Sequence, residues 1–358
     1  MNITRRQLLI GGAAALVLPH TGVARVSAAT QTDIAIVGIN INGGDIFDQG
    51  NPDNLFKHHH GYIYPSDYTE VLQQFYDLEL RVVQLPFKIE RVWRDYPSGK
   101  LDRTEIGLIK EFVAAARKIG LQVHLSPHNF ASFYENKLGS DGWPVAAFAQ
   151  FWGMFAKEFK DEKGVWGFSL DTEPVFEAPF ADGIQFWQPA AQGAVDAIRK
   201  VDKSHLITIP GSDHWANSEL WRYHSDSLRI TDPSDNFAFE ATCYGDYNFS
   251  GKYDLSYAEQ SQVTDPPGNH AHPDIMVDRA RPFADWLVEN NYRGMISEWG
   301  VPTNDPDWLV VADHFLQFLQ ENNMGSSAWA WGPWWPADYP LYISPDGEMA
   351  KLLGDRAS

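Results

Sequence analysis

The chain has 358 residues and a formal net charge of −19, and 44% of its residues are hydrophobic. An acidic surface of this kind repels phosphate backbones and anionic lipid headgroups, which argues against nucleic acid or a membrane as a partner. The single cysteine, Cys243, excludes an internal disulfide, and the apolar content is ample for one large core.

The N-terminus has the features of a twin-arginine export signal. Arg5 and Arg6 precede an apolar run from Ile10 to Leu18, and small residues follow it. The run is too short to span a bilayer comfortably. We therefore expect residues 1–29 to be removed, residues 30–358 to form one domain, and the folded protein to work in a periplasm or outside the cell.

Apolar, β-rich segments alternate with segments of helical period along the rest of the chain. Eight strands with helices between them favour a single (β/α)₈ TIM barrel. An open doubly wound sheet is the alternative, but no glycine-rich phosphate loop follows the first strand. The predicted strands are Ile34–Ile41, Arg81–Leu85, Gln122–Ser126, Val165–Leu170, Leu206–Ile209, Phe237–Ala241, Gly294–Ile296 and Ser326–Ala330, and the predicted helices are Ser66–Leu78, Arg103–Ile119, Pro144–Phe159, Phe186–Val201, Met276–Asn290 and Asp307–Asn322.

Polar and aromatic side chains follow the predicted strands, where a barrel would bring them to one open mouth. Glu173 and Glu298 each come just after an apolar run and lie far apart in the sequence. Two carboxyl groups facing each other across a sugar-binding cleft are what glycosidic bond cleavage requires. The other candidates at the strand ends are Asn40, Gln84, His128, Asn129, Trp215, Tyr244 and Trp329.

The aromatic residues also point to sugar binding. Trp329, Trp331, Trp334 and Trp335 lie close together near the C-terminus. Flat indole faces pair well with the C–H faces of pyranose rings. We expect Trp335 to contact substrate, and Trp215 either to do so or to pack in the core.

The histidines do not predict a metal site. The consecutive side chains of His58–His60 would point in different directions, and His270 and His272 lie in a proline-rich loop. We expect no metal, no cofactor, and a monomer that binds a carbohydrate.

The sequence resembles glycoside hydrolase family 5, in particular its bacterial and fungal endo-β-1,4-glucanases. The similarity extends in collinear order over nearly the whole chain after the signal. The segments that carry it are Gly38–Gly44, Leu85–Arg91, Pro127–Phe130, Pro210–Trp215, Ile230–Pro233, Ser297–Pro302, Trp329–Trp335 and Tyr339–Leu341.

The resemblance implies a retaining double displacement with Glu173 as acid/base and Glu298 as nucleophile. Their carboxyl groups would then lie about 5–5.5 Å apart. Glu173 would need a raised pKa, whereas Glu298 would have to be ionised and hydrogen-bonded. The resemblance further implies that His128, Tyr244 and Trp329 bind the sugar or orient the nucleophile.

Three positions depart from the family's pattern. Gln84 stands where the family has an arginine, Thr172 where an asparagine precedes the acid/base, and Thr242 where a histidine is usual. A changed substrate and lost catalysis in a sugar-binding protein are both open, and transglycosylation is a third hypothesis. We expect hydrolysis of a β-glucan or related β-linked glycan, because both glutamates persist. Asp171 either tunes Glu173 by like-charge repulsion or pairs with a base in the core.

Overall fold

The computed structural model describes residues 31–43, 45, 65–176, 182–264, 268–333, 335–336 and 338–358. The predicted export segment, the histidine run at positions 58–60 and Trp334 lie outside the described residues.

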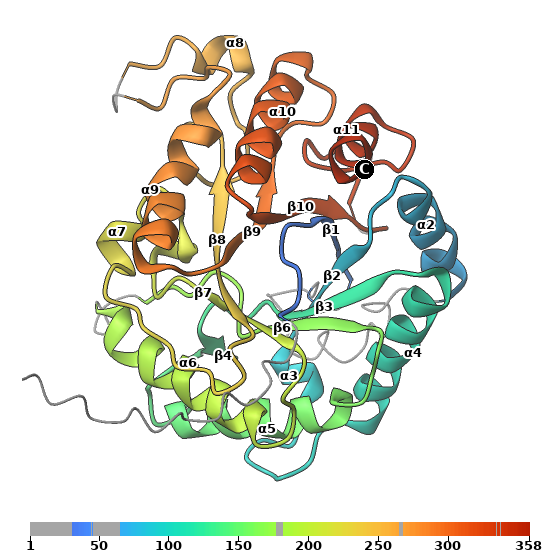
Figure 1. The fold of residues 1–358 in the computed structure, drawn as a ribbon, viewed down its shortest axis with the longest axis vertical. Coiled ribbons are helices and arrows are strands. Elements are labelled where there is room, and N and C mark those ends of the chain that lie inside the picture. Colours follow the sequence, from blue (N-terminus) through green and yellow to red (C-terminus); the bar gives the residue numbers. More distant parts are fainter. Residues whose placement is uncertain are drawn as a thin grey trace, which may run out of the picture.

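Eight parallel strands form a closed barrel (Figure 1). Their order around the barrel is β1-β10-β9-β8-β7-β6-β3-β2, and β1 pairs with β10 through Val37 and Ser326. This closure confirms the predicted (β/α)₈ barrel and excludes an open doubly wound sheet. The barrel strands are β1 (Val37–Ile41), β2 (Val82–Phe87), β3 (Gln122–Pro127), β6 (Val165–Ser169), β7 (Leu206–Pro210), β8 (Phe237–Tyr244), β9 (Gly294–Gly300) and β10 (Gly325–Trp331).

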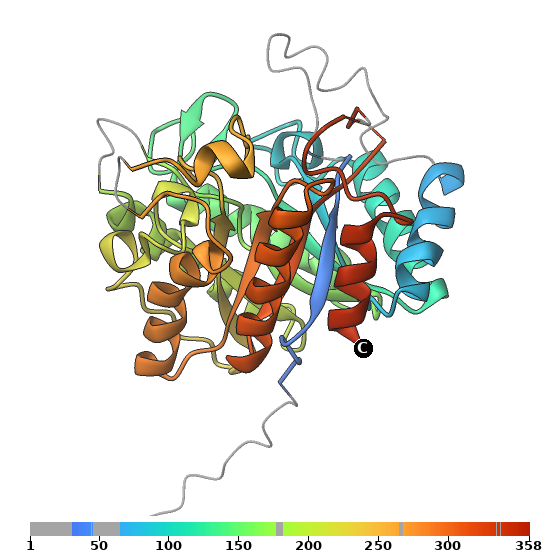
Figure 2. The same ribbon diagram turned by 90° about the horizontal axis from the view of Figure 1, so that it is seen from above.

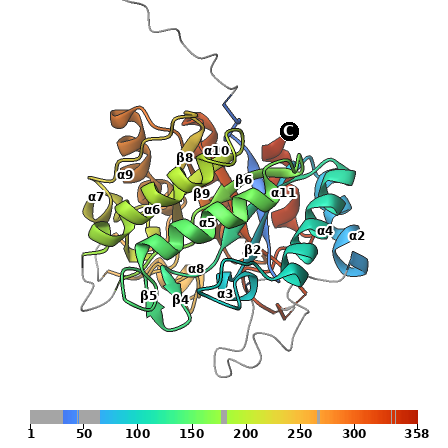
Figure 3. The same cartoon turned by 90° about the horizontal axis from the view of Figure 1, so that it is seen from below.

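Helices surround the barrel as an outer ring (Figures 1 and 3). The six predicted helices are present, with ends that differ from the prediction by a few residues. They are α2 (Pro65–Asp77), α4 (Arg103–Ile119), α5 (Val145–Phe159), α6 (Gly183–Arg199), α9 (Ile275–Asn290) and α10 (Pro306–Glu321).

Several short elements were not predicted. They are the helices α3 (Ile89–Val92), α7 (Trp221–His224), α8 (Tyr257–Gln260) and α11 (Glu348–Ala357), the 3₁₀ turn η2 (His214–Ala216), and the hairpin formed by β4 (Ser132–Phe133) and β5 (Asn136–Lys137). In Figure 2, β1 (blue) points toward the end of the barrel that carries α8 (gold).

Capping residues of the types that helix ends favour are found at the ends of α4 and at the start of α10. Asp102 accepts a hydrogen bond from the N–H of Glu105, and Gly120 ends α4 in the left-handed conformation with φ 111°. Asp305 caps α10 by accepting from the N–H groups of Asp307 and Trp308. These caps satisfy backbone groups that the helices themselves leave unpaired.

The barrel interior changes from apolar to polar along the strands. Near the strand starts, a buried cluster includes Val82, Leu206 and Ala238. Two residues further along the same strands come Gln84, Thr208 and Glu240, which are also buried. Because side chains two apart lie on one face of a strand, the sequence builds a dry floor and then a polar layer beneath the strand ends.

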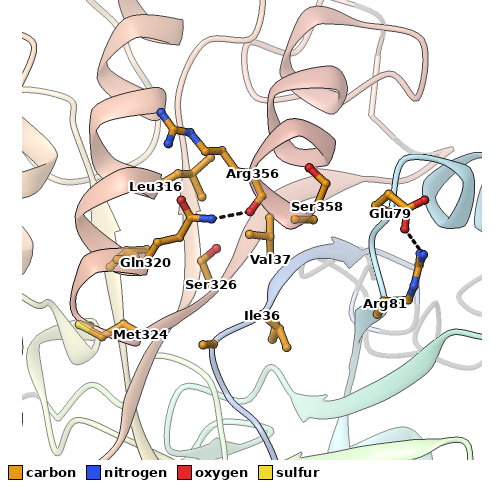
Figure 4. Close-up of a pocket in the computed structure, with 13 residues that line it drawn as sticks. Ile36, Val37, Glu79, Arg81, Leu316, Gln320, Met324, Ser326, Arg356 and Ser358 are labelled. Carbon is orange, nitrogen blue, oxygen red and sulfur yellow. Dashed lines mark hydrogen bonds and ion pairs between the residues drawn. The ribbon is translucent and has the colours of Figure 1, made fainter.

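The end of the barrel where the strands begin has a hollow of about 290 Å³ (Figure 4). Its guanidinium groups already have partners: Arg81 pairs with Glu79, and Arg356 pairs with Asp313. Gln320 donates to the backbone oxygen of Arg356 at 2.5 Å. Neither Glu173 nor Glu298 lines this hollow, so their chemistry belongs to the opposite end.

Within the described residues, no helix has the length and apolar character needed to cross a membrane. Cys243 is a buried free thiol.

Candidate active site

A cavity of about 580 Å³ lies where β8, β9 and β10 end. Both predicted glutamates line it, which places residues 173 and 298 at one opening. The lining residues are Glu173, His214, Trp215, Asn217, Leu220, Thr242, Tyr244, Asn248, Phe249, Ser250, Gly251, Lys252, Glu298, Trp329, Trp335, Tyr339 and Leu341.

Glu298 is held by a tyrosine from the neighbouring strand. Glu298 lies within β9, opposite Thr242 of β8, and is 6% exposed. The hydroxyl of Tyr244 donates to Oε1 of Glu298 at 2.7 Å. Burial raises the pKa of Tyr244 well above its ordinary value. The phenol therefore keeps its proton and remains a donor to the carboxylate.

Glu173 follows β6 in a turn and has a φ of 50°, in the left-handed region. Its carboxyl group shares a hydrogen bond with the hydroxyl of Thr242. The same hydroxyl can instead give its one proton to the backbone oxygen of Trp215, which lies 2.8 Å away. Thr242 thus lies within hydrogen-bonding reach of both the turn after β6 and the turn after β7.

The two carboxyl groups differ in how strongly they hold a proton. Burial and the nearby charge of Glu298 raise the pKa of Glu173 well above its ordinary value, although the hydrogen bond from Thr242 opposes the shift. Burial raises the pKa of Glu298 to about 7, and the hydrogen bond from Tyr244 opposes that shift. Glu173 is therefore the group that retains its proton, and Glu298 the group that ionises first.

Aromatic side chains form the wall nearest to β10. Trp329 stacks on His128, with ring centroids 5.5 Å apart and an interplanar angle of 16°. Its indole N–H donates to the hydroxyl of Tyr339 at 3.1 Å. Trp335 stacks in turn on Tyr339 at 4.2 Å. This wall offers flat apolar faces with fixed orientations, as a pyranose ring requires.

Trp215 also lines the cavity, from the turn after β7, and is 52% exposed. It lies in η2, where three consecutive residues have positive φ. Its backbone N–H donates to the oxygen of Pro174, the residue after Glu173. Trp221, by contrast, is fully buried and packs on Phe283 at 4.3 Å, so it is a core residue.

Two further sequence candidates lie below the cavity rather than in its lining. The amide of Gln84 approaches His124 at 3.0 Å, and His124 reaches the hydroxyl of Thr208 at 2.9 Å. The side-chain amide of Asn40 donates to the backbone oxygen of Ser297 at 3.2 Å, next to Glu298. Both amides belong to the buried polar layer and support the strand ends from beneath.

The candidates that follow β3 and β6 are also buried. His128 is 3% exposed, and burial lowers its pKa to about 4, so its imidazole is neutral. Asn129 does not face the cavity: its amide donates to Glu90 at 2.7 Å and accepts from the N–H of Ile89. The hydroxyl of Thr172 lies 3.0 Å from that of Ser126.

Asp171 organises the backbone around these residues. Its carboxylate accepts hydrogen bonds from the N–H groups of Asn129, Ala131 and Thr172 at 2.8–3.0 Å. The like charge that acts on Glu173 comes from Glu298. Asp171 therefore shapes the loop after β3.

Sequence reasoning missed much of the loop after β8. Residues 248–252 line the cavity, and Asp246 anchors them by accepting from the N–H groups of Ser250 and Gly251. Gly251 has a φ of 70°, and a Cβ there would come within 2.9 Å of the Tyr244 ring. The one sequence signal was this glycine, because only glycine combines that φ with so close an approach.

Among the described residues, no group of three or more His, Cys, Asp or Glu side chains is arranged to hold a metal ion.

The model of the family described as cellulase (glycosyl hydrolase family 5) matches residues 46–334. The chain belongs to glycosyl hydrolase family 5. Membership of this family makes the protein an O-glycosyl hydrolase. Among curated relatives, endo-β-1,4-glucanase A of Emericella nidulans is 26% identical over 275 residues, which cover 76% of each chain.

Solved structures of this family show the same architecture. Endoglucanase Cel5A of Pseudomonas stutzeri is 31% identical, with a TM-score of 0.79 over 90% of this chain and 94% of that one. It has also been solved in complex with cellobiose. The endo-β-1,4-glucanase Xac0029 of Xanthomonas axonopodis pv. citri is 27% identical, with a TM-score of 0.74 over 90% and 98% of the two chains.

Proposed function

We propose that this family 5 protein is a retaining endoglucanase-like hydrolase whose substrate is a β-1,4-glucan or a closely related β-linked glycan. The observation that carries the proposal is the carboxyl pair at one cavity, with the more basic group at Glu173 and a tyrosine-held group at Glu298. Relatives named endo-β-1,4-glucanases support the choice of substrate.

The proposed reaction has two displacements. In the first, a carboxylate oxygen of Glu298 attacks the anomeric carbon. The glycosidic C–O bond breaks, and Glu173 gives its proton to the departing oxygen. In the second, Glu173 removes a proton from water as the water oxygen attacks the same carbon. The bond to Glu298 then breaks, so the product keeps the β configuration and both carboxyl groups return to their starting states.

The departures around the pair leave a sugar-binding protein without catalysis as the second candidate. Gln84 carries no charge and contacts His124 instead of the nucleophile, so Tyr244 is the group that offsets the burial of Glu298. With this donor in place the pKa of Glu298 is about 7, so a substantial share of the group is ionised near neutral pH. We therefore retain hydrolysis as the first candidate, because both carboxyl groups line the cavity.

The deciding experiment traps the nucleophile. Incubation with an activated 2-fluoro-β-cellobioside should label Glu298, as mass spectrometry of the intact protein and its peptides would show. The Glu298→Gln variant, which keeps the shape of the side chain, should not be labelled. A protein that binds cello-oligosaccharides but is never labelled would be the sugar-binding candidate.

The acid/base role of Glu173 has a separate test. Glu173→Ala should lose about 10²–10⁴-fold in turnover of a β-glucan, but much less with a dinitrophenyl cellobioside, whose leaving group needs no proton. Azide should restore turnover and give a β-glycosyl azide. An α-azide would contradict the retaining mechanism, and no loss with the natural substrate would contradict the assignment of Glu173.

We further propose that residues 1–29 are an export signal, that residues 30–358 are the catalytic domain, and that the mature enzyme acts as a monomer in a periplasm or outside the cell.

A further inference from the structure

A second hollow adjoins the catalytic cavity on the side of Trp215. It has a volume of about 450 Å³ and lies between the start of α6 and the segment that contains α7. These two helices are neighbours at the edge of the barrel in Figures 1 and 3. His214 lines both hollows, so they are adjacent at this residue.

Tyr223 gives the second hollow an aromatic wall that is open to solvent. It is 78% exposed, more than Trp215 at 52%. Its ring is nearly perpendicular to that of His214, with ring centroids 5.2 Å apart. Its helix is fixed from below, because Trp221 is fully buried against Phe283 and Trp286. Tyr223 is therefore an exposed aromatic face on a fixed support.

The polar groups of the second hollow suit a neutral, hydroxyl-rich ligand. Asp182, Asp213 and Asp226 line it; Arg222 pairs with Asp226 at 3.2 Å, but no Lys or Arg is among the described residues that line the hollow itself. Carboxylates accept hydrogen bonds from sugar hydroxyls but repel phosphate or carboxylate groups. An aromatic face next to hydroxyl acceptors is the usual composition of a pyranose site.

The hollow lies on the acid/base side of the cavity. The backbone N–H of Trp215 donates to the oxygen of Pro174, and Thr242 joins Trp215 to Glu173. The group that protonates the departing oxygen must reach the leaving part of the chain. A glycan cleaved here would therefore extend its leaving part past Trp215 and His214 toward Tyr223.

We propose that the hollow beside Tyr223 is an outer subsite for a neutral pyranose unit on the leaving-group side of a long glycan. This assignment rests on the proposed function, and it makes the enzyme favour chains over disaccharides. Trp215 and Tyr223 would act as successive stacking faces, with His214 between them.

The test compares Tyr223→Ala with Tyr134→Ala. Tyr134 is also exposed, at 43%, but it lines neither hollow. We expect Tyr223→Ala to raise KM for cellohexaose by about 3–10-fold, the range of one aromatic contact. Its kcat on an aryl cellobioside should not change, and Tyr134→Ala should match the unmodified enzyme on both substrates. Equal effects of Tyr223→Ala on long and short substrates, or none on either, would overturn the subsite.

A binding measurement separates this proposal from the proposed catalytic function. Titration calorimetry with Glu298→Gln should show weaker cellohexaose binding when Tyr223→Ala is added, and unchanged cellobiose binding. That outcome would support the subsite even if the unmodified enzyme hydrolysed no tested glucan. Identical cellohexaose affinity with and without Tyr223→Ala would refute the subsite even if hydrolysis were normal.

Discussion

Thr242 and Tyr244 lie on one face of β8, and each contacts one of the two carboxyl groups. Side chains two apart on a strand share a face, so one strand positions both the acid and the nucleophile. The two contacts act on different protonation steps. Tyr244 favours the ionised form of Glu298, and Thr242 favours the ionised form of Glu173.

Removal of the Tyr244 hydroxyl should therefore move the acid limb of the pH profile. The donor lowers the pKa of Glu298 from what burial alone would give, so Tyr244→Phe should raise that pKa. Ionised Glu298 would then appear only at higher pH. We expect the acid limb of kcat/KM to move up by about 1–2 pH units, the equivalent of one charge-assisted hydrogen bond.

Thr242→Val is the matched control because it acts on the other carboxyl group. It should raise the pKa of Glu173, so the basic limb should move to higher pH while the acid limb stays in place. If Tyr244→Phe moved the basic limb instead, the roles of the two glutamates would be reversed.

Sequence reasoning pointed to the pair of glutamates and to several aromatic residues that line the cavity. It could not determine whether a side chain at a strand end lines the cavity or lies below it. Position in the sequence places Gln84 at the end of its predicted strand, yet only the fold reveals that it contacts His124 below the cavity. Asn129 is similar, because its partner Glu90 comes from a distant segment. Tyr339 lines the cavity from a loop after the last strand, where no periodic pattern marks its direction.

At the scale of elements, length separates most of what the sequence predicted from what it did not, and the ten-residue helix α11 is the exception. The six long helices and eight barrel strands carry enough periodic apolar positions to be recognised. Helices of four residues, such as α7 and α8, form because tertiary contacts hold them, since so short a helix is unstable alone. Strands β8 and β9 extend past their predicted ends, into the residues that form the site.

One buried ion pair joins the end of α6 to the segment before β8. Nε and Nη2 of Arg199 donate to the two oxygens of Asp232 at 2.8 and 2.9 Å, and both side chains are at most 2% exposed. Arg199→Met should lower the free energy of unfolding by about 3–5 kcal/mol, because it leaves a buried carboxylate unpaired. Chemical denaturation would measure the change.

Arg222→Met is the exposed counterpart. Its ion pairs with Asp226 and Glu289 lie in solvent, so the loss of unfolding free energy should stay below about 1 kcal/mol.

The buried pair of Arg199 and Asp232 also predicts a pH dependence of stability. Burial alone would raise the pKa of Asp232, but the hydrogen bonds and charge of Arg199 lower it. The stabilisation that this pair provides should be complete above about pH 4 and decline as the solution becomes more acidic. Equal losses of unfolding free energy for Arg199→Met and Arg222→Met would contradict the contrast between the buried and the exposed pairs.

At the scale of the whole molecule, charge and thiol content are compatible with the export of a folded enzyme that we propose. The net charge is −19, and removal of residues 1–29 would take away three arginines and no acid. Cys243 is buried and free, so no disulfide has to form at the destination. A neutral glycan is indifferent to such a surface, whereas polyanions are repelled.

Twin-arginine export has a direct test in a host that possesses this pathway. Replacement of Arg5 and Arg6 by lysine should leave the enzyme in the cytoplasm, where cell fractionation would detect its activity. The matched change Arg25→Lys should leave export intact. Export that persists in the double variant, or in a host without the pathway, would show that another route is used.

The pairing of β1 with β10 has a consequence for biosynthesis. Strand β1 can pair with β2 soon after both are made, but its other neighbour, β10, is made only near the end of translation. At 5–20 residues per second, that edge waits roughly 15–60 s on the ribosome. Glu298 also emerges late, so a nascent chain is inactive until its final strand seals the ring. Ribosome-bound intermediates thus carry an unpaired edge of β1 until β10 has been made.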